Sequence, residues 1–252
     1  EPDAVLGHSK GEIAACQVAG LFNLEEAVDL ALLRGRVVKE ASGGGLLAVS
    51  APQDEIKPTL ETGYDRTAIA VRNSPGQCVI GGPLESLEEL QQDFEQRGFE
   101  CGMVPASFAS HSPLMEEYSR ELETRLDWLN PSEADIEIYS PMTAEASAPQ
   151  TFQGDYWGEQ LHTPVEFAQT IEKMNKDGFT DFIEISAHPV LTRAIEQTYD
   201  ARSADVRTHP SLQKNVGELQ RLFTSLASCF EAGFEPDFRT IYPAGSVQSI
   251  PT

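Results

Sequence analysis

The sequence predicts an α/β protein in which a small domain is inserted into a larger one. Short apolar runs typical of strands alternate with longer amphipathic runs typical of helices, which favours a parallel or mostly parallel sheet covered on both faces. Residues 44–106 break that alternation with their own order of elements, βαββαβ. We therefore expect a large domain from residues 1–43 and 107–232, a small domain at 44–106 and a tail at 233–252. A chain of 252 residues is long enough for both cores.

The first element is a sharp turn around a serine. Residues 7–12 are Gly-His-Ser-Lys-Gly-Glu, a G-x-S-x-G pattern between a short apolar strand at 4–6 and an apolar-rich run at 13–21. A strand, a turn of small residues and then a helix is the setting of a nucleophile elbow, in which the hydroxyl of Ser9 projects toward a substrate carbonyl. The amide of Lys10, at the start of that helix, is a candidate oxyanion donor. The alternative is that Ser9 only caps a helix.

A second helix follows and carries a candidate anion-binding arginine. Asn23 and Glu26 form a capping-box pattern at its start. Arg34 lies one turn after Leu30 and one turn before Val38, on a face that the spacing predicts to be buried. A buried arginine needs an anion as its partner. The alternative is that its stem packs in the core while its charged head reaches water.

The small domain has the element order of a ferredoxin-like fold. A Ser-Gly-Gly-Gly break precedes it at residues 42–45. The expected strands are at 46–50, 67–71, 77–80 and 100–104, and the expected helices are at 53–61 and 84–97. In a ferredoxin-like fold, two split βαβ units pack both helices on one face of an antiparallel sheet.

The chain then returns to the large domain. Helices are expected at residues 113–126, 156–161, 165–177, 190–197 and 216–232, and strands at 136–139 and 181–185. The strand at 181–185 is apolar, and we expect it to be buried. The segment 144–154 has no periodic pattern, so we expect a plain, flexible loop there.

A serine nucleophile needs a base, and the chain has five histidines. His8 adjoins the serine, but neighbouring side chains on a tight turn diverge, which makes it a poor base. His162 and His209 lie in polar stretches and are expected at the surface. His111 lies in a small-residue loop at the junction of the two domains, and His188 follows a strand end, where active-site loops of α/β proteins collect. The residues alone leave His111 and His188 in competition for the role.

The composition restricts the possible partners. The net charge is -22, from 40 acidic and 18 basic residues, which argues against binding to nucleic acid or to an anionic membrane. No run reaches the roughly 18 apolar residues of a membrane-spanning helix, and no basic and then apolar leader opens the chain, so we expect a cytoplasmic protein. The four cysteines are far apart and suit reduced thiols, and no pattern indicates a metal site.

Several motifs together resemble the acyltransferase domain of modular type I polyketide synthases, in the family of malonyl-CoA:acyl-carrier-protein transacylases. Residues 7–12 match the family's G-H-S-x-G-E motif, and Arg34 matches a family arginine that lies 25 residues after the serine. Phe-Ala-Ser-His at 108–111 matches the motif that contains the catalytic histidine. Further matches, in the family's order, are at 73–75, 156–157, 164–167 and 182–191, and the tail from residue 233 resembles the linker that follows this domain.

The resemblance implies an α/β-hydrolase-like large subdomain with an inserted ferredoxin-like subdomain. It also implies that Ser9 is the nucleophile, that His111 is its base and that the amide of Lys10 is one oxyanion donor. Arg34 would hold the carboxylate of the acyl group. A backbone carbonyl near residues 186–188 would orient His111.

The same resemblance implies residues that shape the acyl pocket. His8, Phe108 and Ser110 would bind substrate, and Asn73 and His188 would be structural supports. Family members that use malonyl groups typically have phenylalanine at the position of Ser110. Because serine leaves room for an α-methyl branch, we expect methylmalonyl-CoA to be favoured and malonyl-CoA to be possible.

The implied reaction is a two-step acyl transfer without a bound cofactor. Malonyl-CoA or methylmalonyl-CoA would be the donor and the phosphopantetheine of an acyl carrier protein the acceptor, with a ketosynthase and other synthase domains as neighbours. One alternative is a serine hydrolase or thioesterase, which would need an acid partner for its histidine. Another is a non-catalytic docking fragment. The family's second oxyanion donor precedes the elbow in a Gly-rich segment, so we expect the N-terminal part of the large subdomain to be missing from this chain.

Overall fold

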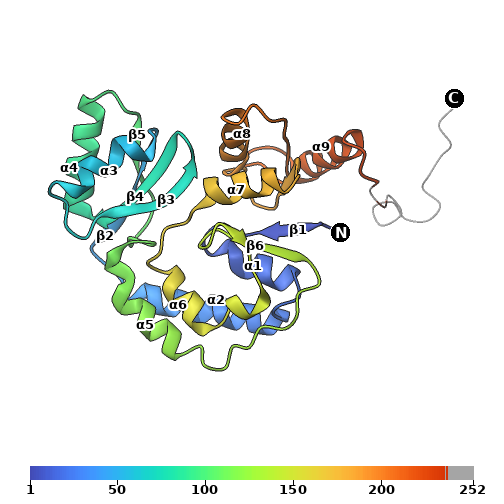
Figure 1. The fold of residues 1–252 in the computed structure, drawn as a ribbon, viewed down its shortest axis with the longest axis horizontal. Helices are drawn as coiled ribbons and strands as arrows, with labels where there is room; N and C mark the ends of the chain where they lie inside the picture. The colour runs from blue at the N-terminus through green and yellow to red at the C-terminus, as the bar shows by residue number, and fades with distance from the viewer. Residues whose placement is uncertain (236, 238–252) are drawn as a thin grey trace.

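The computed structural model describes residues 1–235 and 237. The expected linker at 233–252 therefore lies mostly outside the described residues. Figure 1 shows an antiparallel sheet with its helices against one face, a group of helices beside two short parallel strands, and a C-terminal part with further helices. This arrangement of mixed strands and helices confirms the predicted α/β fold.

The strand before the serine lies beside a strand from the second half of the chain. β1 (Ala4–Leu6) pairs in parallel with β6 (Glu137–Ser140), and β7 (Glu145–Ala146) pairs with β6 in the antiparallel sense. The parallel pair agrees with the prediction. The plain loop expected at 144–154 is wrong, because this segment contains β7 and a 3-10 helix, η2 (Pro149–Thr151). β7 is a two-residue strand, and glutamate and alanine are depleted in strands, so its pairing with β6 across a short turn was not predicted.

Four helices surround the main core: α1 (Gly11–Val18), α2 (Leu24–Lys39), α5 (Glu116–Thr124) and α6 (Gly154–Gln160). Apolar side chains that these helices bury together include Ile13, Cys16, Leu30, Leu122 and Trp157. The predicted capping box of α2 is present, since Asn23 and Glu26 each accept the other's backbone N–H. The helix expected at 113–126 is divided, because η1 (Pro113–Met115) forms a separate 3-10 turn before α5.

The inserted sheet has the predicted βαββαβ order. Its strands are β2 (Gly44–Val49), β3 (Ala68–Ser74), β4 (Gln77–Pro83) and β5 (Cys101–Val104), and its helices are α3 (Gln53–Glu61) and α4 (Leu84–Gln96). The strand order is β3-β4-β2-β5, with every neighbouring pair antiparallel. Alternation along the strands separates the two faces: Leu47 and Ile80 pack with α3 and α4, whereas Leu46 and Val79 belong to the core on the opposite face.

The C-terminal part covers that opposite face. Its elements are α7 (Phe167–Lys176), β8 (Asp181–Glu184), α8 (Thr192–Asp200), β9 (Arg207–Pro210) and α9 (Glu218–Glu231). β8 and β9 form a parallel pair of their own, separate from β1 and β6. The expectation of a buried strand at 181–185 is wrong, because Ile183 is 59% exposed and Ile185 is 82% exposed. β9 was not predicted from the sequence.

Two histidines differ from their expected surface positions. His209 is only 2% exposed, because it lies on β9 under α9, and its Nδ1 is 2.9 Å from Ser228 Oγ. His162 is half-buried in the turn after α6. Polar neighbours in the sequence did not reveal the burial of His209, because α9, a separate element, provides the cover.

The thiols agree with the expectation of reduced cysteines. Cys16, Cys78, Cys101 and Cys229 are all free, and three of them are buried. Within residues 1–235 and 237, no three His, Cys, Asp or Glu side chains are grouped as metal ligands would be. Over the same residues, no helix combines the length and the apolarity needed to cross a membrane.

Candidate active site around Ser9 and His111

Ser9 lies in a tight turn between β1 and α1. Its φ is +53°, in the left-handed region that side-chain-bearing residues rarely adopt. The Gly11 N–H donates to the His8 carbonyl and the Glu12 N–H donates to the Ser9 carbonyl, both at 3.0 Å. Lys10 is the N-cap of α1, and its N–H has no acceptor in the described part of the chain. The turn therefore brings the serine hydroxyl and an unpaired amide to the same helix terminus.

Gly7 allows α1 to approach this turn. A Cβ atom at Gly7 would lie 2.1 Å from the Cα of Glu12, which is backbone and cannot move aside cheaply. A Cβ atom at Gly11 would meet nothing within 4 Å. The two glycines of the G-x-S-x-G pattern therefore differ, since packing within the chain requires only the first of them to lack a side chain.

Replacing Gly7 with alanine is expected to lower the free energy of unfolding by at least about 3 kcal/mol, because β1 or α1 must move to remove the overlap. Gly11→Ala is the matched control and is expected to stay within about 1 kcal/mol of wild type, since alanine favours a helix more than glycine does. Urea unfolding followed by circular dichroism measures both. Equal unfolding midpoints for the two variants would contradict this account of Gly7.

His111 is the histidine that the structure brings to the serine. Its Nε2 lies 2.6 Å from Ser9 Oγ, and its Nδ1 lies 3.0 Å from the carbonyl oxygen of Thr163. A carbonyl can only accept, so Nδ1 carries the ring proton and Nε2 accepts from the serine hydroxyl. The backbone N–H of His111 donates to the Leu161 carbonyl at 2.7 Å, which ties the ring's backbone to the same segment.

The carbonyl that orients His111 is not in the expected segment. We expected it near residues 186–188, but the carbonyl that receives Nδ1 belongs to Thr163. Ser186 instead donates to the carbonyl of His188 at 2.8 Å, and the exposed His188 ring accepts from the backbone N–H of Lys214 at 3.4 Å. Any residue type supplies a backbone carbonyl, so neither composition nor spacing could have identified Thr163.

Arg34 is buried close to this pair. It is 7% exposed, and its Nη2 donates to Gln160 Oε1 at 3.0 Å. Its Nε is buried and has no partner within the described residues. Burial lowers the pKa of Arg34 to about 10, which still leaves the guanidinium charged at neutral pH. The alternative in which its head reaches water is therefore wrong.

The charge of Arg34 acts on the histidine. Burial is the main reason that the pKa of His111 falls to about 4, and the nearby positive charge of Arg34 lowers it further. The imidazole is therefore neutral at physiological pH, which is the state that can accept the serine proton.

The other expected site residues differ in what they contact. His8 Nε2 lies 3.0 Å from Asn73 Oδ1 on β3, and the His8 ring meets the Phe167 ring edge-on with centroids 5.3 Å apart. His8 is thus hydrogen-bonded to the inserted sheet. Phe108 packs half-buried against the main core, and Ser110 is half-buried next to His111.

The segment 160–166 connects His111 to the inserted sheet, a role that the sequence did not predict. It supplies the two carbonyls that bond to His111. It then runs along β3, where the Val165 N–H donates to Ala70 and the Arg72 N–H donates to Val165, both at 2.9 Å. This single segment therefore links the histidine to the inserted sheet. Val165 was expected at the start of a helix, but α7 begins only at Phe167, and Val165 instead forms a parallel bridge with Val71.

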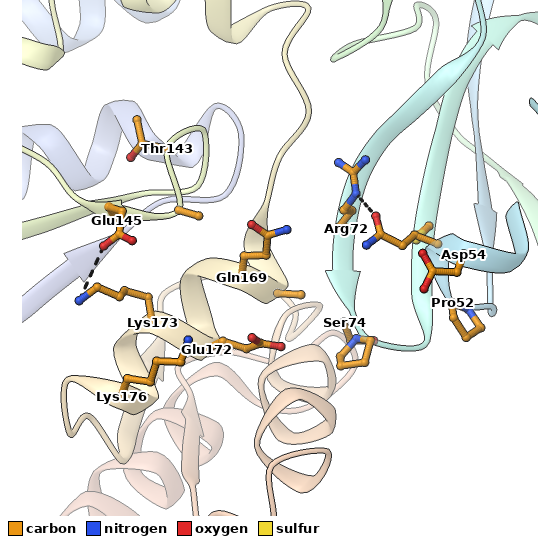
Figure 2. A pocket seen from close by; sticks show the side chains of 15 residues that line it. Pro52, Asp54, Arg72, Ser74, Thr143, Glu145, Gln169, Glu172, Lys173 and Lys176 are labelled. Atoms are coloured by element: carbon orange, nitrogen blue, oxygen red, sulfur yellow. Dashed lines mark hydrogen bonds and ion pairs between the residues drawn. The ribbon is translucent and has the colours of Figure 1, made fainter. Parts of the chain in front are cut away.

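A cleft of about 550 Å³ lies between the inserted sheet and α7 (Figure 2). Arg72 bonds to Gln53 on one side of it, and Lys173 pairs with Glu145 at 3.7 Å on the other. Neither Ser9 nor His111 lines it. Arg72 and Lys173 each also pair with a carboxylate outside the cleft lining, Glu166 and Asp177 respectively, so neither cation is left free to hold an anionic ligand there.

Comparison with known sequences finds one family over nearly the whole chain. Residues 1–236 match the family described as acyl transferase domain. Erythronolide synthase EryA2 of Saccharopolyspora erythraea is 32% identical over 252 residues, which are 100% of this chain and 7% of that protein. The spectinabilin polyketide synthase system protein NorA of Streptomyces orinoci is 38% identical over 240 residues, covering 94% of this chain and 13% of its own length. The chain thus spans a small part of each relative.

Solved structures give a consistent result. The acyltransferase domain from module 8 of the salinomycin polyketide synthase is 32% identical, with a TM-score of 0.91 over 95% of this chain and 57% of that one. The malonyl CoA-acyl carrier protein transacylase of Clostridium perfringens is 26% identical, with a TM-score of 0.81 over 92% of this chain and 73% of that one. The fold around Ser9 and His111 is therefore similar to that of both proteins.

Proposed function

Because the chain belongs to the family of acyl transferase domains, we propose that it moves a carboxyacyl group from a CoA thioester to the phosphopantetheine thiol of an acyl carrier protein, through an ester on Ser9. The observation that carries this proposal is the buried, charged Arg34 beside a Ser9–His111 pair at 2.6 Å. A serine–histidine pair suits many acyl transfers. A buried arginine with an unpartnered Nε suits an acyl group that ends in a carboxylate.

The first half-reaction forms the ester. Nε2 of His111 takes the proton of the Ser9 hydroxyl while Oγ attacks the carbonyl carbon of the thioester. The N–H of Lys10 stabilises the oxyanion of the tetrahedral intermediate. When the intermediate collapses, the C–S bond breaks and His111 gives its proton to the departing CoA sulfur. The products are the Ser9 ester and CoA, and the imidazole is neutral again.

The second half-reaction reverses these roles. The phosphopantetheine thiol gives its proton to His111 and attacks the ester carbon. The C–O bond to Ser9 then breaks, and His111 returns the proton to Oγ. Arg34 holds the carboxylate in both halves, so the acyl carbonyl keeps one position relative to the nucleophiles.

The hydrogen-bond partner of His111 Nδ1 favours acyl transfer over hydrolysis. A serine hydrolase commonly orients its histidine with a carboxylate, which also stabilises the imidazolium. Here the partner of Nδ1 is the neutral carbonyl of Thr163. The fixed carboxylate-binding arginine is also unnecessary for a general thioesterase. These observations support transfer as the better proposal and leave hydrolysis as an outcome of the test below.

Methylmalonyl-CoA is the favoured donor in this proposal, with malonyl-CoA as the second. Ser110 is small and half-buried beside His111, which leaves space for one methyl branch. One methyl group is worth about 1 to 3 kcal/mol, so a preference is expected rather than exclusion of malonyl-CoA.

The relatives are synthase proteins much longer than this chain, which supports a proposal about its partners. We propose an acyl carrier protein as the acceptor and a ketosynthase and other synthase domains as neighbours. A bound cofactor has no step in this reaction. The cytoplasmic location expected from the sequence remains a prediction.

Intact-protein mass spectrometry tests the proposed function. Wild type incubated with methylmalonyl-CoA or with malonyl-CoA should gain the mass of one carboxyacyl group, and Ser9→Ala should gain none. A mixture of the two thioesters gives the preference between donors. Rapid return to the unmodified mass in water without an acceptor would favour a hydrolase. No gain on a chain that circular dichroism shows to be folded would favour the docking fragment.

A further inference from the structure

Arg34 and Glu12 are opposite charges buried near each other without a direct ion pair in the part of the chain that the structure describes. Arg34 is 7% exposed and Glu12 is 0% exposed. Two such charges would normally pair directly, because each otherwise carries a large desolvation cost. Here both bond to the amide of Gln160, which is itself 2% exposed.

The orientation of the Gln160 amide follows from its neighbours. Its Oε1 accepts from Arg34 Nη2 at 3.0 Å. Its Nε2 donates to Glu12 Oε2 at 2.7 Å and to the Ser9 carbonyl at 3.2 Å. A guanidinium can only donate, and a carbonyl can only accept, so a flipped amide would lose these bonds. The amide therefore has one stable orientation, with its oxygen toward the arginine.

Other bonds keep Glu12 in place on the far side of the amide. Tyr156 donates its hydroxyl to Glu12 Oε1, and Ser140 Oγ lies 2.6 Å from the same tyrosine oxygen. Both carboxylate oxygens of Glu12 are thus used by neutral groups. Burial raises the pKa of Glu12 to about 7, although these hydrogen bonds and the charge of Arg34 oppose the rise.

The bond to Gln160 leaves part of the Arg34 guanidinium without a hydrogen-bond acceptor. The neutral amide satisfies one N–H of Nη2, while Nε stays buried and unpartnered within the described residues. A carboxylate in place of that amide would form an ion pair with the guanidinium and offset its charge. A substrate carboxylate would then have to displace it.

We propose that Gln160 is a specificity-determining positioning residue, whose neutral amide separates Arg34 from Glu12 and thereby keeps the guanidinium available to a substrate carboxylate. This inference rests on the proposed function for the identity of the substrate. It adds that discrimination between carboxyacyl and neutral acyl thioesters depends on a residue that need not touch the acyl group.

The test measures binding, so that it does not depend on turnover. In a Ser9→Ala background, the dissociation constants of malonyl-CoA and acetyl-CoA are measured by calorimetry for the parent chain, Gln160→Glu and Gln160→Met. Gln160→Glu replaces the amide by a carboxylate of the same shape. Gln160→Met is the matched control, because it is similar in length, neutral and unable to form these hydrogen bonds. Circular dichroism confirms that each chain is folded.

The parent is expected to bind malonyl-CoA more tightly than acetyl-CoA, and Gln160→Glu is expected to lower that ratio by about 10-fold or more. Gln160→Met is expected to change both affinities together and to leave the ratio within about 3-fold of the parent. The proposal is overturned if Gln160→Glu keeps the ratio, if Gln160→Met loses it equally, or if the parent has no preference. Failure of the proposed function shows separately, as an absence of Ser9-dependent acylation in wild type.

Discussion

Replacing His111 with glutamine is expected to slow acylation of Ser9 by about 10²- to 10⁴-fold, the usual contribution of a general base. Glutamine fills a similar volume and can bond to the Thr163 carbonyl, but it cannot accept the serine proton. Single-turnover acylation with methylmalonyl-CoA, followed by mass spectrometry on quenched samples, measures the rate. The loss should appear as a slower chemical step at saturating thioester.

His188→Gln is the matched control for this change. His188 is exposed, and its Nδ1 accepts from the backbone of Lys214, so the variant should acylate at nearly the wild-type rate. This comparison also separates the two bases that the sequence leaves in competition. A large loss in His188→Gln together with a small one in His111→Gln would reverse the assignment.

The pH dependence gives a second check on His111. Burial, followed by the charge of Arg34, lowers its pKa from the usual 6.5 to about 4. Acylation should therefore stay near its maximum well below pH 6 and fall as the pH approaches 4. The same shift affects stability. Because folding lowers the pKa of His111, its contribution to the free energy of unfolding is present above pH 6.5 and is lost as the pH falls through 4. The pKa of Glu12 is raised to about 7, so its effect is the opposite. Its contribution to the free energy of unfolding is present at low pH and is lost as the pH rises through 7.

On acidification from pH 7 to 5, His111→Gln should therefore lose less stability than wild type. Urea unfolding at the two pH values measures this difference. A wild-type chain whose acylation titrates near pH 6.5 would show instead that the imidazole is not desolvated in solution.

Replacing Arg34 with alanine is expected to lower kcat/KM for carboxyacyl-CoA by about 30- to 1,000-fold, the range for losing one partner of a buried charge pair. Acetyl-CoA has no carboxylate, so its kcat/KM should change little, and the discrimination between the two thioesters should largely disappear. Arg34→Lys should recover only part of the loss, because an ammonium cannot make two parallel hydrogen bonds to a carboxylate. Acylation rates over a range of thioester concentrations measure all three variants.

Arg36→Ala is the control for Arg34. It lies two residues further along α2 on the exposed side, so it removes the same charge from the chain without opening the site. Its discrimination should match that of wild type. If Arg34→Ala also kept its preference for carboxyacyl groups, the carboxylate would have to bind elsewhere and the proposed function would lose its main support.

Features that depend on neighbours in sequence were predictable. The capping box of Asn23 and Glu26 starts α2 where the pattern indicated, because both partners lie within one turn. The inserted sheet was predictable for a related reason, since alternating side chains such as Leu46 and Leu47 must face opposite sides of a strand. The strand β9 and the burial of His209 were missed because they depend on β8 and α9, which are separate elements of the chain. The pairing of β7 with β6 was also missed, although the two strands are close in sequence, because Glu145 and Ala146 are not typical strand residues.

The sequence by itself determined the α/β fold and the inserted βαββαβ unit. Its motifs also named Ser9, Arg34 and His111 as candidate site residues, and only the family resemblance favoured His111 over His188. The motifs indicate which side chains are present but not which atoms hydrogen-bond to them. Only the tertiary structure decided that Thr163, 52 residues beyond His111, supplies the carbonyl that fixes its tautomer, and that Gln160 stands between Arg34 and Glu12. The path of the folded backbone determines which groups come within hydrogen-bond distance. Every residue has a backbone carbonyl, and no sequence spacing marks the carbonyl or the buried amide that will be used.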